Sequence, residues 1–84
     1  MKEQDKLLER GWDCLSILRH YFDEAIQTKQ FDEADRLVHE YAGAALMLHG
    51  LELISGEDYY SWTERIHICY RRARYPGAYP EGDS

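Results

Sequence analysis

The residues with the most chemical potential lie near the end of the chain, in the run Glu64-Arg65-Ile66-His67. Helical di-metal carboxylate proteins use a Glu-x-x-His spacing, with both ligands pointing into a bundle. On a helical wheel, Glu64 lies ~160° from the apolar Ile66, so its carboxylate is expected to face solvent. The chain also contains no second Glu-x-x-His. The spacing alone therefore predicts no metal site.

Other metal and nucleophile patterns are equally incomplete. His67 and Cys69 would point ~200° apart on a helix, whereas structural zinc sites usually take four ligands in compact pairs. No serine lies in a nucleophile elbow, and no glycine-rich phosphate loop or dinucleotide fingerprint is present. We therefore expect a protein that is not an enzyme and that has no metal or cofactor. A metal-binding or enzymatic helical bundle is kept as the more remote alternative.

Four arginines give the end of the chain its only basic segment. On the expected helix Arg65 and Arg72 share one flank, whereas Arg71 and Arg74 lie on another. A recognition helix would present one coherent face to a nucleic-acid groove. A nucleic-acid-binding regulator that uses these four arginines is therefore an alternative, not the leading hypothesis.

Length and composition indicate one small globular domain. The 84 residues are 44% hydrophobic and 31% charged, with a net charge of −6 at pH 7. This balance is typical of a folded domain and not of a disordered chain. Residues 31–60 carry seven carboxylates against one arginine, and such acidity opposes binding to phosphate backbones.

The compartment can be inferred from what the sequence lacks. No run approaches the ~18 apolar residues that a membrane span requires, and the first ten residues contain no apolar signal-peptide core. Cys14 and Cys69 are few for a disulfide framework and fit a reducing compartment, although a disulfide between them is not excluded by the sequence. We expect a cytoplasmic protein without membrane contact.

Hydrophobic periodicity predicts three helices, at about residues 5–28, 32–53 and 56–74, and thus an all-α fold. Short polar turns separate them, which favours an antiparallel three-helix bundle as a single domain over residues 1–75. In the first helix the apolar stripe covers about half the circumference, which is too wide for a strict coiled-coil seam. Residues 76–84 are rich in Pro, Gly and Tyr, lack periodicity and are expected to form a flexible tail.

Cap residues define the expected helix starts. Asp32 is a suitable N-cap for the second helix. Ser55 is one for the third, with Asp58 as the capping-box acid and Ile54 placed to pack on Tyr59 as a hydrophobic staple.

The run Phe31-Asp32-Glu33-Ala34 resembles the start of the second helix of a tetratricopeptide repeat. That family has a small residue where this chain places Phe22, and no second repeat exists here. The resemblance covers half a motif and implies only a local helix–turn–helix.

The second helix is the centre of the predicted architecture, because its later part is apolar on nearly every side. Its expected core face consists of Ala34, Leu37, Val38, Tyr41, Ala44, Ala45, Leu48 and Leu51. Opposite that face lies a second stripe of Gly43, Leu46, Met47, Gly50 and Leu53. Each glycine inside a helix costs about 1 kcal/mol relative to alanine, so two on one stripe suggest close approach of another backbone. The alternative is that Gly50 only ends the helix as a cap.

The second stripe leads to the functional prediction. An apolar patch outside the core is an association site or an aggregation liability, and the same helix of a second copy is the simplest occupant. We expect a non-enzymatic helical module that forms a homodimer, or binds and inhibits or regulates another protein. Small acidic inhibitors encoded by mobile elements, which block bacterial nucleases or defence complexes, are similar in size and charge.

Overall fold

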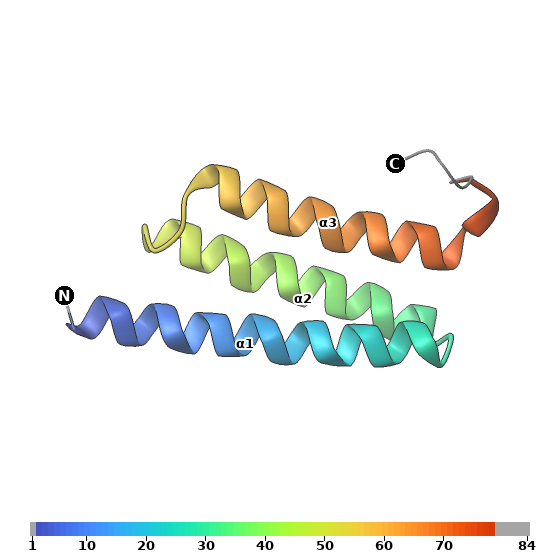
Figure 1. The fold of residues 1–84 in the computed structure, drawn as a ribbon, viewed down its shortest axis with the longest axis horizontal. Coiled ribbons are helices and arrows are strands. Elements are labelled where there is room, and N and C mark those ends of the chain that lie inside the picture. Colours follow the sequence, from blue (N-terminus) through green and yellow to red (C-terminus); the bar gives the residue numbers. More distant parts are fainter. Residues whose placement is uncertain (1, 79–84) are drawn as a thin grey trace.

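The computed structural model describes residues 2–78 and confirms the predicted all-α three-helix bundle (Figure 1). The elements are α1 (Lys2–Gln27), α2 (Phe31–Gly50), α3 (Gly56–Arg74) and the 3-10 helix η1 (Pro76–Ala78). No strand occurs among the described residues. The first three residues of the predicted flexible tail thus form a helical turn, and the rest of that tail lies outside the described part of the chain.

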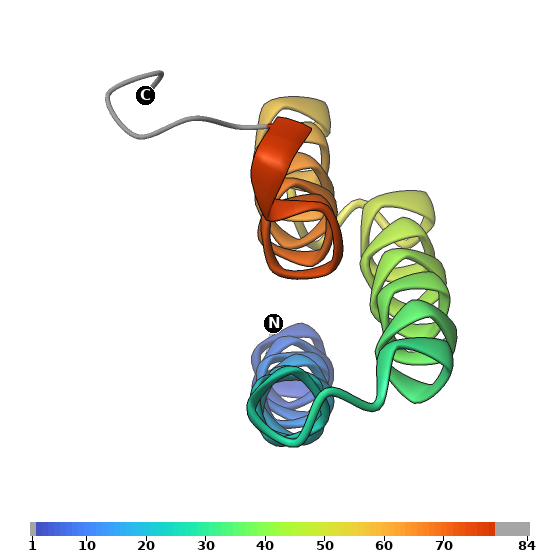
Figure 2. The same cartoon turned by 90° about the vertical axis from the view of Figure 1, so that its right-hand side faces the viewer.

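The middle helix packs against both of the others. Successive helices run antiparallel (Figure 1), and α2 has extensive contacts with α1 and with α3. Viewed along the bundle, α1 and α3 lie on the same side of α2 (Figure 2). One face of α2 therefore supplies both internal contacts, and its opposite face is not covered by either helix.

The core consists of two clusters along this face of α2. One cluster has the buried residues Phe22, Ala25, Ala34, Leu37, Val38 and Ile66. The other has the buried residues Leu15, Ala45, Leu48 and Ile54. Tyr41, which is half-buried, packs against both. Five of the eight residues predicted for the core face of α2 are buried. This confirms the helical periodicity on which the prediction of that face was based.

A close contact between α1 and α2 depends on a glycine. A Cβ on Gly11 would meet three carbon atoms of the Leu48 side chain, with Cγ at 3.1 Å. Leu48 is only 6% exposed, so its side chain has little room to move away. The absence of a side chain at Gly11 thus lets Leu48 fill the space against α1.

The turn between α1 and α2 differs from the prediction at its second half. Helix α2 begins at Phe31, and Gln30 is the N-cap, without a side-chain hydrogen bond. The prediction that Asp32 is the N-cap is therefore wrong. Asp32 lies in the first turn of α2, where its negative charge interacts favourably with the helix dipole. The cause is the end of α1, where Lys29 at φ 59° and the hydrogen bond from Gln30 N to Ala25 O reverse the chain one residue early.

The end of α2 is also earlier than predicted, at Gly50 and not at Leu53. Glu52 has the left-handed φ of 61°. Its N–H donates to His49 O at 2.9 Å, and Leu53 N–H donates to Leu48 O at 3.0 Å. These two bonds form a Schellman motif, which reverses the chain and brings Leu53 against the second core cluster.

The start of α3 matches the predicted cap. Ser55 Oγ accepts a hydrogen bond from Asp58 N–H at 3.1 Å. Ile54, directly before this cap, is buried in the second core cluster, and Tyr59 packs against that cluster. This arrangement is the hydrophobic staple that the sequence predicted.

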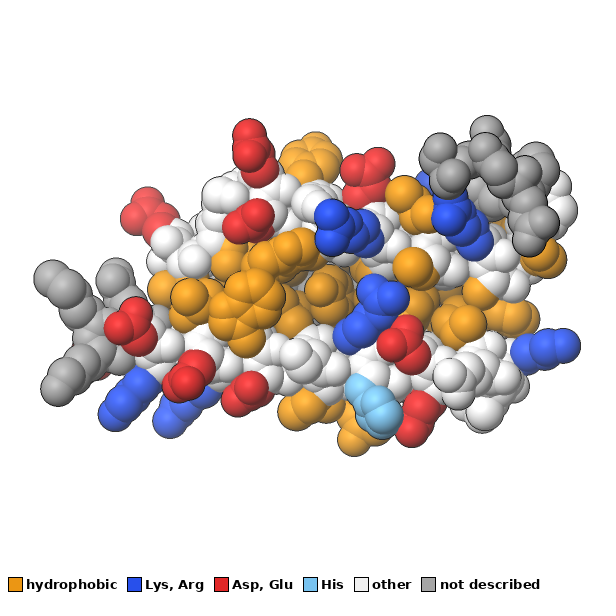
Figure 3. All heavy atoms as spheres, viewed as in Figure 1, with side chains coloured by type: hydrophobic (Ala, Val, Ile, Leu, Met, Phe, Trp, Pro, Cys, Tyr) orange, Lys and Arg blue, Asp and Glu red, His pale blue; other side chains and the backbone are white. Residues whose placement is uncertain are grey.

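Side chains also join α1 and α3 directly. The rings of Trp12 and Trp62 lie 4.6 Å apart between centroids, and Arg19 Nη2 lies 3.7 Å from Cys69 Sγ. Figure 3 shows hydrophobic side chains gathered between α1 and α3 on this side of the bundle, with acidic groups along α1. The space between these two helices is thus occupied by their own side chains.

The left-handed residue in the Schellman motif gives a direct test of where α2 ends. A left-handed conformation costs a residue with a side chain about 1–2 kcal/mol, and glycine avoids this cost. Glycine also makes the unfolded chain more flexible, which offsets part of the gain. Glu52→Gly should therefore raise the unfolding free energy by about 0.5–1 kcal/mol. Urea denaturation measures this change. Glu64→Gly, at an exposed position inside α3, is the control and should lower stability by about 0.7–1 kcal/mol. A loss of stability in Glu52→Gly would mean that the helix continues to Leu53.

Candidate protein-interaction surface

Four of the five residues of the predicted second stripe are exposed on the side of α2 away from the other helices. Leu46 is 53% exposed and Met47 is 67% exposed. Gly43 and Gly50 are also exposed, and a Cβ on either would meet nothing within 4 Å. We call these four residues the α2 patch. No contact within the described chain accounts for its apolar character.

The structure changes the stripe at its C-terminal end. Leu53 was predicted to belong to it, but follows the Schellman turn and packs, half-buried, against the second core cluster. Leu51 was predicted to lie on the core face, but is 53% exposed. Both errors come from extending the helical wheel past Gly50, where the chain leaves the helix.

Helix α1 also has exposed apolar residues, which belong to the wide apolar stripe that the sequence predicted for it. Leu7, Trp12 and Tyr21 are each about half exposed, and Cys14 is exposed. Leu7 lies one turn before Gly11, and Leu51 follows Leu48 by three residues. Because Gly11 meets Leu48 across antiparallel helices, these two exposed leucines are expected at the same level along the bundle. The apolar stripe of α1 covers about half of its circumference, and α2 and α3 bury only part of that width.

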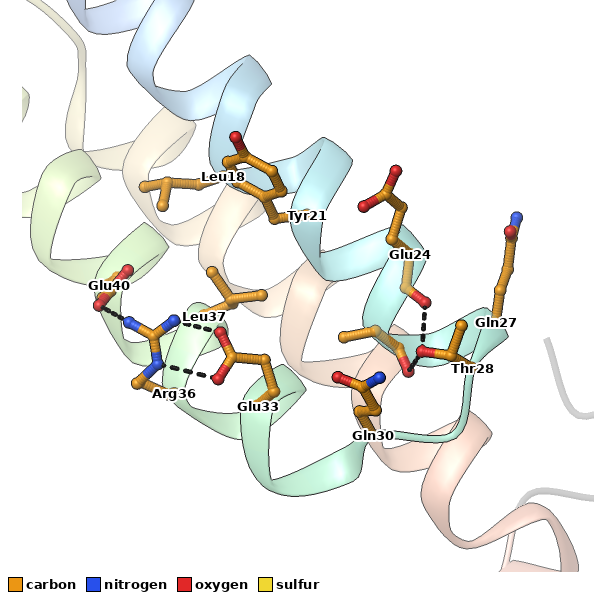
Figure 4. A pocket seen from close by; sticks show the side chains of 11 residues that line it. Leu18, Tyr21, Glu24, Gln27, Thr28, Gln30, Glu33, Arg36, Leu37 and Glu40 are labelled. Carbon is orange, nitrogen blue, oxygen red and sulfur yellow. Dashed lines mark hydrogen bonds and ion pairs between the residues drawn. The ribbon is translucent and has the colours of Figure 1, made fainter.

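A separate hollow of about 770 Å³ opens between α1 and α2, nearer the turn that joins them (Figure 4). Its apolar lining comes from Leu18, Tyr21, Ala25 and Leu37. Its charged lining comes from Glu24, Glu33, Arg36 and Glu40. None of these residues belongs to the α2 patch.

The charges beside this hollow are partly paired. Arg36 bonds to Glu40, and also to both carboxylate oxygens of Glu33, with Nε 3.2 Å from Oε2 (Figure 4). The Arg36 guanidinium lowers the pKa of Glu33, which keeps this carboxylate ionised. On α1, Glu24 has His20 Nε2 at 3.1 Å. With three carboxylates and one guanidinium, the lining carries a net negative charge at neutral pH.

The candidate nucleic-acid residues lie apart from this region, on α3. Arg65, Arg71 and Arg72 are exposed. Arg74 is half-buried and bonds to Tyr70 Oη, with its guanidinium carbon 5.7 Å from the centroid of the Tyr75 ring. One of the four arginines is thus engaged in contacts within the chain.

The candidate metal ligands Glu64 and His67 point to different surroundings. Glu64 is exposed, whereas His67 is half-buried with its ring centroid 6.4 Å from that of His39 on α2. Burial lowers the pKa of His67, and the positive charge of Arg71 lowers it further. Within residues 2–78, no group of three or more His, Cys, Asp or Glu side chains is placed to hold a metal ion.

Both cysteines are free thiols, Cys14 exposed on α1 and Cys69 half-buried on α3. Among residues 2–78, none of the helices combines the length and the apolar composition that a membrane span requires.

The chain was compared with protein-family models, with curated proteins and with solved structures, and none matches it.

The two kinds of glycine in the bundle can be distinguished by substitution. Gly43 faces open space, so Gly43→Ala should raise the unfolding free energy by up to about 1 kcal/mol through helix propensity. Gly11→Ala gains the same propensity but overpacks Leu48, and should lower stability by about 1 kcal/mol. Thermal and urea unfolding at low protein concentration would show the opposite signs. A loss of stability in Gly43→Ala would place Gly43 inside the core.

Proposed function

We propose that the protein is a non-enzymatic helical module that binds protein through the α2 patch, and that the partner at this patch is a second copy of the chain. The observation that carries the proposal is the exposure of Leu46 and Met47 at 53% and 67% on a helix whose other face forms the core. A contiguous apolar patch of this kind typically marks an interaction site.

The pattern within the α2 patch suits another helix. On the helical wheel, Gly43 and Gly50 lie within ~20° of each other, and Leu46 and Met47 lie ~50° to either side of that line. A second helix could approach the backbone along the two glycines, because neither has a Cβ neighbour within 4 Å. Leu46 and Met47 would then pack along its two flanks.

The same spacing is self-complementary. In an antiparallel pair centred between Leu46 and Met47, Gly43 of one copy lies opposite Gly50 of the second copy. A two-fold axis there produces an interface in which each copy contributes the same residues, as in most homodimers. We therefore propose a homodimer in which two α2 helices cross at the patch. Regulation or inhibition of another protein would use surfaces that this dimer leaves open.

The dimer can be tested by sedimentation of Leu46→Asp. A carboxylate in the middle of an apolar interface is strongly unfavourable, so the dissociation constant should rise at least thirty-fold, on the order of 2 kcal/mol. Because Leu46 is half exposed in the monomer, circular dichroism should show unchanged helix content and an unfolding free energy within about 0.5 kcal/mol of wild type.

Ile17→Asp is a matched control, because Ile17 is 54% exposed but lies on α1, on the side opposite its core face. It should leave the sedimentation coefficient unchanged. A wild-type protein that remains monomeric at high concentration would contradict the dimer. Unfolding of Leu46→Asp would instead assign the patch to the core.

A further inference from the structure

The hollow between α1 and α2 offers a second docking surface that the proposed dimer does not use. Its lining runs from Leu18 on α1 to Thr28, the residue directly after that helix, a distance of about 15 Å at the rise of an α-helix. That length matches about three turns of another helix. Leu18 and Tyr21 lie on the α1 side of the hollow and Leu37 on its α2 side (Figure 4). Ala25, seven residues after Leu18, also lines the α1 side. An amphipathic helix with apolar residues at i, i+3 and i+7 has the complementary spacing.

The charges around the hollow select among such helices. Glu24 lies on the α1 edge and Glu40 on the α2 edge (Figure 4). On the α2 side, Arg36 bonds both Glu33 and Glu40, so these two carboxylates carry one more negative charge than the guanidinium neutralises. A helix with basic residues on both flanks of its apolar face would meet Glu24 on one side and this excess negative charge on the other. An acidic helix, or a phosphate backbone, would be repelled by the same groups.

We propose that this hollow binds a basic amphipathic helix of another protein. The apolar side chains of that helix would cover Leu18 and Tyr21, and its lysines or arginines would pair with Glu24 and Glu40. The proposal goes beyond the homodimer and uses none of the residues of the α2 patch.

The test uses a synthetic amphipathic helix of about twelve residues, with leucines at i, i+3 and i+7 and lysines on both flanks. Binding to the full chain is measured by fluorescence anisotropy. Glu24→Gln combined with Glu40→Gln should weaken binding about three- to ten-fold, as expected for the loss of two exposed ion pairs. The affinity of wild type should fall as salt is raised. A peptide with glutamates in place of the lysines should bind at least ten-fold more weakly than the lysine peptide.

Two controls separate the hollow from general effects of charge and apolar area. Glu57→Gln combined with Glu64→Gln, both exposed on α3, makes the same change in net charge and should alter binding less than two-fold. Tyr21→Ala should weaken binding about ten-fold. Tyr60→Ala should not, because Tyr60 lies on α3 and is more exposed than Tyr21.

Several results would overturn the proposal. These are equal binding of the lysine and glutamate peptides, binding of neither, or equal losses in the hollow and α3 variants. If Glu24→Gln combined with Glu40→Gln dissociates the homodimer in sedimentation without any peptide, the hollow belongs to the dimer interface and the proposal is wrong. The effect of Leu46→Asp on sedimentation does not depend on peptide binding, so the two proposals can fail separately.

Discussion

The structure depends on one face of α2 serving two neighbours. Since α1 and α3 lie on the same side of this helix (Figure 2), residues such as Leu37, Val38 and Ala45 must fill both contacts at once. Among residues 2–78 no element covers the back of α2, although its later half remains apolar. In the proposed homodimer, the same helix of a second copy would bury this surface.

Most of the fold could be predicted from the sequence, because the period of apolar residues is a property of each helix alone. The positions of Leu37, Val38 and Leu48 followed from this period, and the cap at Ser55 from its side-chain chemistry. Both turns were predicted, but the bounds of α2 beside them were wrong, and each turn contains a left-handed residue with a side chain, Lys29 and Glu52. Glycine usually marks such positions, and without it the sequence did not define where the helix begins and ends.

The candidate surface was predictable only in part. Gly43, Leu46 and Met47 lie inside α2, so the helical wheel placed them correctly opposite the core. The exposure of Leu7 and Tyr21 depends on how much of α1 its neighbours cover, which the period of α1 does not determine. The role of Gly11 was equally hidden, because only the packed pair of helices brings Leu48 against it. The hollow arises from the separation of two helices and has no signature along the chain.

The central claim, that a second copy covers the α2 patch, is tested most directly by methyl NMR of the wild-type protein over a series of concentrations. Leu46 and Met47 report on the patch, whereas Leu37 and Val38, which are 3% and 1% exposed, report on the core. The account predicts that the methyl shifts of Leu46 and Met47 move together from micromolar to millimolar protein while those of the core residues stay fixed. Constant shifts at Leu46 and Met47 across the whole series would contradict it.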